Sequence, residues 1–161
     1  MQCNCVINHM SVRKRTAMSN EFDTLKLENQ LCFPLYAGSR EIRKQNKTYR
    51  DELDLTYTQY ITMMVMWERK QINVKELGEC LFLDSGTLTP LLKKLEQKGW
   101  VTRQRAKSDE RVLIVTLTPA GEELRKKAVM VPQKMACCVK LSPEEVQTLY
   151  TLLYKLLDDR C

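Results

Sequence analysis

The sequence predicts a mainly α-helical protein with one small β-hairpin, and three observations support this fold class. Apolar residues recur every three or four positions along most of the chain, as they do on one face of a helix. Directly after Gly99 the spacing changes to every second position, which is typical of strands. Glycine and proline number only five each among 161 residues, so the chain contains few turns.

The overall composition indicates a globular protein with an anionic partner. Hydrophobic residues make up 43% of the chain and charged residues 29%, as in folded domains. The length favours a single domain, and the net charge of +6 favours an anionic partner. No apolar run approaches the roughly 20 residues that a membrane-spanning helix needs, so no membrane association is expected.

The cysteines indicate a reducing compartment and no metal centre. There are seven, an odd number, and no secretory leader precedes them, so a disulfide scaffold is not expected. The chain has one histidine, His9, and no Cys-x-x-Cys pair, so ligand spacing typical of zinc is lacking. We therefore expect a cytoplasmic protein without a cofactor or a bound metal.

The amino-terminal part is predicted to be a tail followed by a long helix. Residues 1–19 show no periodicity and are expected to be disordered. Over residues 24–47 the apolar spacing is helical, and Pro34 inside this stretch is expected to kink the helix. Cys32 would then lie in the middle of a helix, where the dipole at the helix start has little influence on it.

Two capping boxes predict a helix-turn-helix in the next part of the chain. Thr56 is followed by Gln59 three positions later, and the helix they open is expected to end near Lys70. Asn73 with Glu76 opens a second, short helix that is expected to end near residue 81. A third helix follows immediately, so short capped helices succeed one another as in a helix-turn-helix.

The third helix of this group, within residues 83–99, is predicted to read DNA. Leucines at helical spacing form one apolar stripe, and Gly99 suits the left-handed position that ends a helix. Small hydroxyl groups near the start of this helix suit base edges in a major groove, and the lysines behind them suit phosphates. The stripe consists of Leu88, Leu91, Leu92 and Leu95. The side chains expected to contact DNA are Ser85, Thr87, Thr89, Lys93 and Lys94.

A hairpin of residues 100–105 and 111–117 follows this helix and completes a winged helix-turn-helix over residues 56–118. Basic side chains crowd this hairpin and suit the negative potential of a DNA groove; they are Arg103, Arg105, Lys107 and Arg111. Asp109, two residues before Arg111, is expected to hold the side chain of that arginine at the tip of the wing.

The carboxy-terminal helices are predicted to form a dimer interface together with the first helix. Thr118 before Pro119 caps a helix expected to reach the neighbourhood of Cys138, and Ser142 before a proline caps the last one. The last helix carries a wide apolar stripe, which a second copy of the chain can cover. Residues 20–161 then make one domain, in which the helices within 24–47 and 119–158 dimerise.

At this point the residues resemble a known family. Leu83–Lys93, Ser108–Arg111 and Leu117–Thr118 are similar to the MarR-type winged-helix regulators. Leu27–Phe33 with Leu35–Tyr36 resembles the branch of organic hydroperoxide resistance regulators (OhrR). The resemblance covers the chain from about Lys26 to Leu157. It implies a homodimeric repressor that binds double-stranded operator DNA and releases it when organic hydroperoxide oxidises a sensing cysteine.

The resemblance also implies roles for single residues. Cys32 matches the sensing cysteine, and Tyr36 and Tyr57 match tyrosines that hydrogen-bond it. Asn46 stands where the family has a third tyrosine, and Pro34 replaces the usual apolar residue. Asp109 and Arg111 match the pair in the wing.

Two further cysteines are candidates for the thiol that resolves the oxidised Cys32. The segment before Cys137 resembles that of family members whose resolving cysteine belongs to the partner subunit and lies five residues after a proline. Cys138 remains the alternative. Cys80 is expected to pack in the core of the helix-turn-helix, and Cys161 is terminal.

The chemistry of the sensor follows from general thiol reactivity. The thiolate attacks a peroxide, and an unperturbed cysteine is only a few per cent thiolate at neutral pH. Phenolic hydrogen bonds from Tyr36 and Tyr57 can favour the anion. Three other functions stay open: the same fold gated by a small phenolic or antibiotic-like ligand, a thiol peroxidase enzyme, and an interaction module without DNA.

Overall fold

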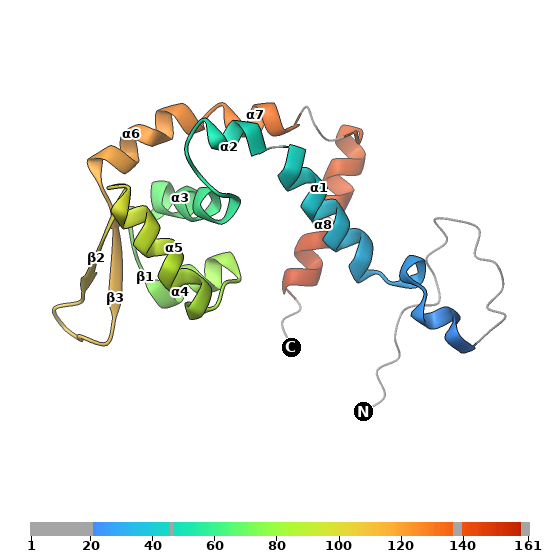
Figure 1. Cartoon of the computed structure of the whole chain (residues 1–161), viewed down its shortest axis with the longest axis horizontal. Helices are drawn as coiled ribbons and strands as arrows, with labels where there is room; N and C mark the ends of the chain where they lie inside the picture. Colours follow the sequence, from blue (N-terminus) through green and yellow to red (C-terminus); the bar gives the residue numbers. More distant parts are fainter. Residues whose placement is uncertain (1–20, 46, 137–139, 159–161) are drawn as a thin grey trace. The chain divides into compact units, whose positions relative to one another are not determined.

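The computed structural model describes residues 21–45, 47–136 and 140–158, and the chain divides into two compact units at Glu41 and Ile42. Short 3-10 helices η2 (Glu21–Leu25) and η3 (Leu27–Asn29) precede the first α-helix. The α-helices are α1 (Cys32–Gln45), α2 (Lys47–Asp51), α3 (Tyr57–Arg69), α4 (Val74–Leu81), α5 (Ser85–Gln97), α6 (Pro119–Ala128), α7 (Val131–Ala136) and α8 (Pro143–Asp158). Figure 1 gives their order along the chain.

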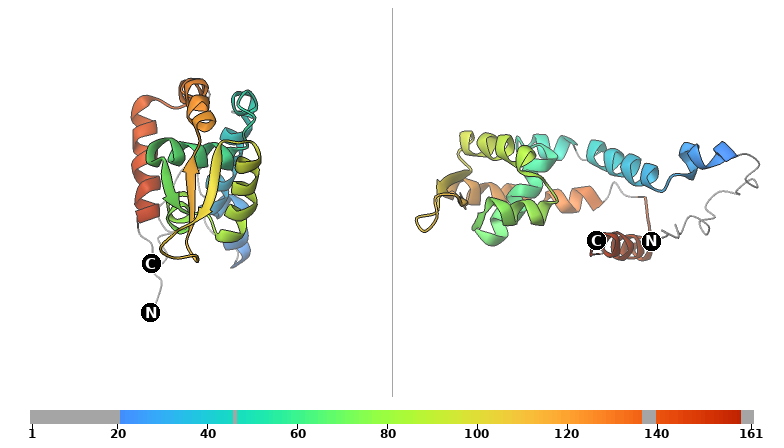
Figure 2. Two further views of the ribbon diagram at one scale, coloured as in Figure 1. Left: turned by 90° about the vertical axis from the view of Figure 1, so that its left-hand side faces the viewer. Right: turned by 90° about the horizontal axis from the view of Figure 1, so that it is seen from below.

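One antiparallel sheet carries the wing. Strands β2 (Val101–Arg105) and β3 (Leu113–Leu117) form the predicted hairpin, with Val101 opposite Leu117 and Arg105 opposite Leu113. A third strand, β1 (Gln71–Asn73), pairs with the other edge of β3, so β3 lies between its neighbours (Figure 2, left). Strand β1 was not predicted, because three residues are too few for a period of two to appear.

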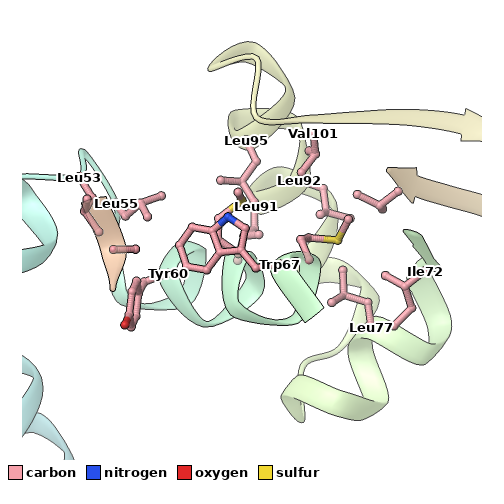
Figure 3. Packing of buried hydrophobic residues seen from close by; sticks show 14 of the residues in the cluster. Leu53, Leu55, Tyr60, Trp67, Ile72, Leu77, Leu91, Leu92, Leu95 and Val101 are labelled. Atoms are coloured by element: carbon pink, nitrogen blue, oxygen red, sulfur yellow. The ribbon is translucent and has the colours of Figure 1, made fainter. Parts of the chain in front are cut away.

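The core of the larger unit lies where α3, α4 and α5 pack against each other and against the sheet. The leucine stripe of α5 is buried as predicted, with Leu88 and Leu92 1% exposed and Leu95 fully covered. Figure 3 shows Leu91, Leu92 and Leu95 of this stripe in the core. Each buried leucine stabilises the fold by about 1.5–3 kcal/mol relative to an exposed one. On α3, the Trp67 Nε1–H donates to the Gly121 carbonyl at 2.8 Å, which ties α3 to the start of α6.

The predicted caps are present. The Thr56 hydroxyl accepts the N–H of Gln59, and the Gln59 side chain accepts the Thr56 N–H at 3.0 Å, so α3 opens on a complete capping box. Asn73 caps α4 through the Glu76 N–H at 2.8 Å. Gly99 has a φ of 76°, the left-handed value expected after α5.

The first α-helix differs from the prediction at its start. It begins at Cys32 and not near residue 24, and the segment before it is 3-10 and extended. Pro34 therefore lies in the first turn of α1, where its missing N–H has no intrahelical partner to lose. The predicted kink does not arise, and Cys32 lies at the start of a helix instead of in its middle.

The helix predicted to run from Pro119 to near Cys138 is interrupted. It ends at Ala128, and α7 begins at Val131. Pro132 explains the break, because a proline clashes with the carbonyl four residues earlier, here that of Ala128. Residues 137–139 lie outside the described part of the chain.

The last helix, α8, has the predicted cap and the predicted apolar stripe. Ser142 and Glu145 exchange capping hydrogen bonds at 3.3 and 2.8 Å. Apolar side chains of α8 are exposed in the single chain, with Leu152 56% and Leu156 58% accessible. An exposed apolar stripe of this kind is typical of an interaction surface.

Candidate nucleic-acid interface and thiol site

The start of α5 is built around Asp84. Its carboxylate accepts the backbone N–H of Thr87 at 2.9 Å and the Thr87 hydroxyl at 2.8 Å, and these bonds lower the pKa of Asp84. The Thr89 hydroxyl donates to the Ser85 carbonyl at 2.7 Å. Since both hydroxyl hydrogens are used within the helix, Thr87 and Thr89 present oxygen lone pairs and methyl groups to the outside. Those groups suit amino groups and thymine methyls in a major groove.

The remaining side chains predicted on α5 are free to approach a nucleic acid. Ser85, Lys93 and Lys94 are exposed, on the faces that the leucine stripe leaves open. The hairpin of β2 and β3 extends beyond the helices in Figure 1. Helix and wing therefore present exposed basic groups from one unit of the chain.

The wing loop is shaped by Asp109 in a way that differs from the prediction. Its carboxylate accepts the backbone N–H of Arg111 at 2.9 Å, not the guanidinium. The Asp109 carbonyl also accepts the N–H of Val112 at 3.0 Å. A short side chain two residues earlier reaches the backbone more easily than the end of an arginine, as in an Asx turn. Asp109 thus fixes the turn, and the Arg111 side chain is exposed.

Arg103 joins α5 to the wing. Its Nε and Nη2 donate to the Glu96 carboxylate at 3.0 and 2.6 Å, and its backbone N–H donates to the same group at 3.1 Å. These bonds lower the pKa of Glu96. The pair therefore stabilises the fold above the ordinary pKa of a glutamate, and that contribution is lost as the pH falls through the lowered value. The guanidinium of Arg105, by contrast, donates to the Glu110 carbonyl at the exposed tip.

Replacing Arg111 with alanine is expected to weaken DNA binding about tenfold or more, the effect of losing one groove-inserted cation. The measurement is fluorescence anisotropy with duplexes that the protein selects from a random-sequence pool. Arg125→Ala, on α6, removes the same charge and is the matched control, expected to bind nearly as wild type. Equal losses in the two variants would mean that only net charge matters and that the wing tip has no specific contact.

The predicted sensing cysteine lies in the smaller unit. Cys32 is exposed and is the first residue of α1, so it lies at the positive end of the helix dipole. This corrects the expectation of a position in mid-helix. Tyr36 follows one turn later, and its hydroxyl accepts a hydrogen bond from Arg40 at 2.7 Å. The guanidinium of Arg40 also lies 5.5 Å from the centre of the same ring.

The second predicted tyrosine lies in the larger unit among cations that sequence reasoning did not find. The guanidinium carbons of Arg43 and Arg50 lie 5.7 and 5.5 Å from the centre of the Tyr57 ring. Arg50 is buried and lines a groove of about 670 Å³ next to Tyr57, Lys47 and Lys98. The spacing of Arg40 from Tyr36 is a helical i, i+4 pair that could have indicated that contact. Burial of an arginine has no comparable signal in a single sequence.

The other sequence predictions at this site have mixed outcomes. Cys80 is exposed, contrary to the expectation of a core position, because Leu77 and Gly78 occupy the inward side of the short α4. Asn46, Cys137 and Cys138 lie outside the described residues. Within the described ranges, no group of three or more histidine, cysteine or acidic side chains could hold a metal ion, and none of the helices could cross a membrane.

Comparison with known proteins identifies the family. A family model described as transcriptional regulator SarA/Rot matches residues 44–128. The organic hydroperoxide resistance transcriptional regulator of Bacillus subtilis (strain 168) is 49% identical over 141 residues, which cover 88% of this chain and 96% of that protein. These relatives are regulators of transcription and not enzymes.

Solved structures of similar proteins support the same family. Reduced AbfR bound to DNA is similar with a TM-score of 0.69 and 34% identity, over 84% of this chain and 94% of that one. Disulfide-formed AbfR is similar with a TM-score of 0.58 and 36% identity, over 83% and 94%. AbfR has also been described from Staphylococcus epidermidis. The fold, the helix-turn-helix with its wing and these similarities show that the chain belongs to the MarR-type winged-helix transcriptional regulators, in the branch of the organic hydroperoxide resistance regulators.

Proposed function

We propose that this protein is a homodimeric repressor that senses organic hydroperoxide through Cys32 and releases operator DNA on oxidation. The observation that carries the proposal is an exposed thiol at the start of α1 with a tyrosine one turn away. The chain is similar to a regulator described both bound to DNA and with a disulfide formed. A reducing cytoplasm would keep the thiol ready between exposures, so we propose that location.

The DNA contacts proposed for this function come from α5 and the wing. Thr87 and Thr89 face base edges, Lys93 and Lys94 face phosphates, and Arg111 enters the minor groove. Ser85 and Arg105 lie beside them, while Arg103 and Asp109 hold the wing in shape. A C₂ dimer would place two such sets about 34 Å apart, one turn of duplex DNA.

The proposed oxidation proceeds in two balanced steps. The Cys32 thiolate attacks one oxygen of the hydroperoxide, the O–O bond breaks, and the other oxygen leaves as an alcohol after taking a proton. The sulfenic acid so formed reacts with the thiol of Cys137 from a second copy, which gives a disulfide and water. The donors assigned to the sulfur are the hydroxyls of Tyr36 and Tyr57.

Disulfide formation offers a physical route to DNA release. The two Cα atoms must come within about 7 Å. If the reduced cysteines lie farther apart, the helices that carry them must move, and the spacing of the two α5 helices changes with them. Loss of register with the duplex then removes several base and phosphate contacts together.

The test is DNA binding by the full-length protein, with cumene hydroperoxide as the oxidant and dithiothreitol as the reductant. Peroxide is expected to release the duplex, and the reductant is expected to restore binding. Protein that keeps its DNA after stoichiometric oxidation would contradict the proposal.

Replacing Cys137 with serine is expected to abolish the covalent dimer that peroxide produces, because the sulfenic acid on Cys32 then lacks its partner thiol. A non-reducing gel before and after oxidation measures this. Cys138→Ser is the matched control and should leave the dimer band intact. The reverse pattern would assign the resolving role to Cys138.

A second candidate is regulation by a small phenolic or antibiotic-like ligand. It is favoured by the groove beside Tyr57, where the buried Arg50 leaves guanidinium nitrogens unpaired. Salicylate would then raise the unfolding temperature and release DNA even from the Cys32→Ser protein. Peroxide sensing through Cys32 predicts no such release.

A further inference from the structure

Arg50 is the most anomalous polar side chain in the larger unit. It is only 5% exposed, and its Nε and Nη1 have no hydrogen-bond partner among the described residues. Its Nη2 donates to the carbonyl of Arg43 at 2.8 Å. Leaving donors of a buried cation unpaired is costly, so a compensating interaction or a function is required to retain it.

The compensating contact is the ring of Tyr57. The guanidinium carbon of Arg50 lies 5.5 Å from the ring centre, and that of Arg43 lies 5.7 Å from it. The hydrogen bond from Arg50 to the Arg43 carbonyl keeps the two arginines together. The Arg50 carbonyl accepts the N–H groups of Leu53 and Leu55, both at 3.0 Å, and this fixes the turn that leads into α3. The guanidinium groups of Arg43 and Arg50 are thus both positioned near the ring of Tyr57.

The groove around Arg50 carries charged side chains of both signs. Five other charged residues line the same groove, and one of them, Asp54, forms an ion pair with Lys98 at 2.7 Å. No ion pair to Arg50 is found among the described residues. The positive charge of Arg50 also acts on a second tyrosine, Tyr60. Burial raises the pKa of Tyr60, and the charge of Arg50 opposes that rise. Besides Arg50 and Asp54, the charged residues that line the groove are Lys47, Asp51, Lys94 and Lys98.

We propose that Arg50, with Arg43, is a positioning residue that makes the Tyr57 hydroxyl a stronger hydrogen-bond donor to the sulfur of the sensing cysteine. A cation against the ring withdraws electron density from the phenol, and the low dielectric around a buried charge strengthens this effect. The inference rests on the proposed function, in which Tyr57 donates to Cys32. Arg50 itself touches neither the thiol nor the peroxide in this account; it acts through Tyr57.

The test is the second-order rate constant for oxidation of the reduced full-length protein by cumene hydroperoxide. Arg50→Gln is expected to lower this constant about tenfold, whereas Arg50→Lys retains a cation and is expected to keep most of it. Arg43→Gln, from a less buried position, should give a smaller loss in the same direction. Lys134→Gln is the matched control, since Lys134 lies 5.2 Å from the ring centre of a different tyrosine, Tyr49.

A double-mutant cycle separates the electrostatic role from a structural one. In a Tyr57→Phe background, Arg50→Gln is expected to cause no further loss, because the hydroxyl through which it acts is absent. An equal loss with and without that hydroxyl, or oxidation of Arg50→Gln at the wild-type rate, overturns the inference. If Arg50→Gln does not fold, Arg50→Lys and Arg43→Gln carry the same comparison.

Failure of the proposed function would give a different result from failure of the inference about Arg50. Tyr57→Phe would then oxidise as wild type, and Cys32→Ser would still release DNA under peroxide. A slow Tyr57→Phe variant with an unaffected Arg50→Gln variant leaves the proposed function intact and refutes the role of Arg50 alone.

Discussion

Cys32→Ser is expected to bind DNA within about twofold of the wild-type affinity and to lose its response to organic hydroperoxide completely. The thiol is exposed at the start of α1, in the smaller unit, whereas the leucine stripe and the wing belong to the larger unit. Replacing its sulfur with oxygen therefore leaves the core contacts of the proposed DNA-binding elements intact. A serine hydroxyl forms no sulfenic acid and no disulfide, so the proposed signal cannot start.

The measurement is release of a fluorescent duplex during titration with cumene hydroperoxide. Cys80→Ser is the matched control, because Cys80 is also an exposed free cysteine and lies in α4, which packs against α5. That variant should respond as wild type. Retained response in Cys32→Ser together with a lost response in Cys80→Ser would move the sensor into the helix-turn-helix.

Gly121→Ala is expected to destabilise the fold by about 3 kcal/mol, the upper range for overpacking a tight site. A Cβ at Gly121 would lie 2.2 Å from the Trp100 carbonyl oxygen and 2.8 Å from a methyl group of Leu117. The backbone cannot yield easily there, because the Gly121 N–H is bound to Thr118 at 3.0 Å and its carbonyl accepts the Trp67 indole.

Thermal unfolding followed by circular dichroism checks this, with an expected fall in Tm of roughly 6–12 °C. Gly38→Ala is the matched control. Gly38 lies inside α1 with no atom within 4 Å of an added Cβ, so there alanine should add about 0.5–1 kcal/mol through helix propensity. Equal effects at both positions would mean that the close approach to Trp100 is not sensitive to volume.

The helix starts capped by hydroxyl and amide side chains were predictable because capping is a local interaction. Thr56 with Gln59 and Thr118 with Pro119 each settle a helix start within four residues. The start of α1 was predicted wrongly since its apolar spacing continues upstream of Cys32. Periodicity alone does not distinguish a helix from a 3-10 and extended segment with similar side chains.

The candidate site was predictable in its residue types but not in its contacts. Asp109 and Arg111 were expected to interact through side chains, and the structure joins them through the backbone N–H instead. Arg103 was expected to face DNA, yet it holds Glu96 across the junction of α5 and β2. Which partner an arginine takes depends on residues brought near it by folding.

The sequence by itself determined the class of this protein: the leucine stripe of α5, the hairpin after Gly99 and the segment around Cys32 each follow from local spacing or from resemblance to the family. Only the tertiary structure decided the third strand β1, the exposure of Cys80 and the burial of Arg50 against Tyr57. The physical reason is that helix and strand periods reflect interactions over a few residues. Burial, strand pairing and ion pairs depend on segments that are distant in sequence and adjacent only after folding.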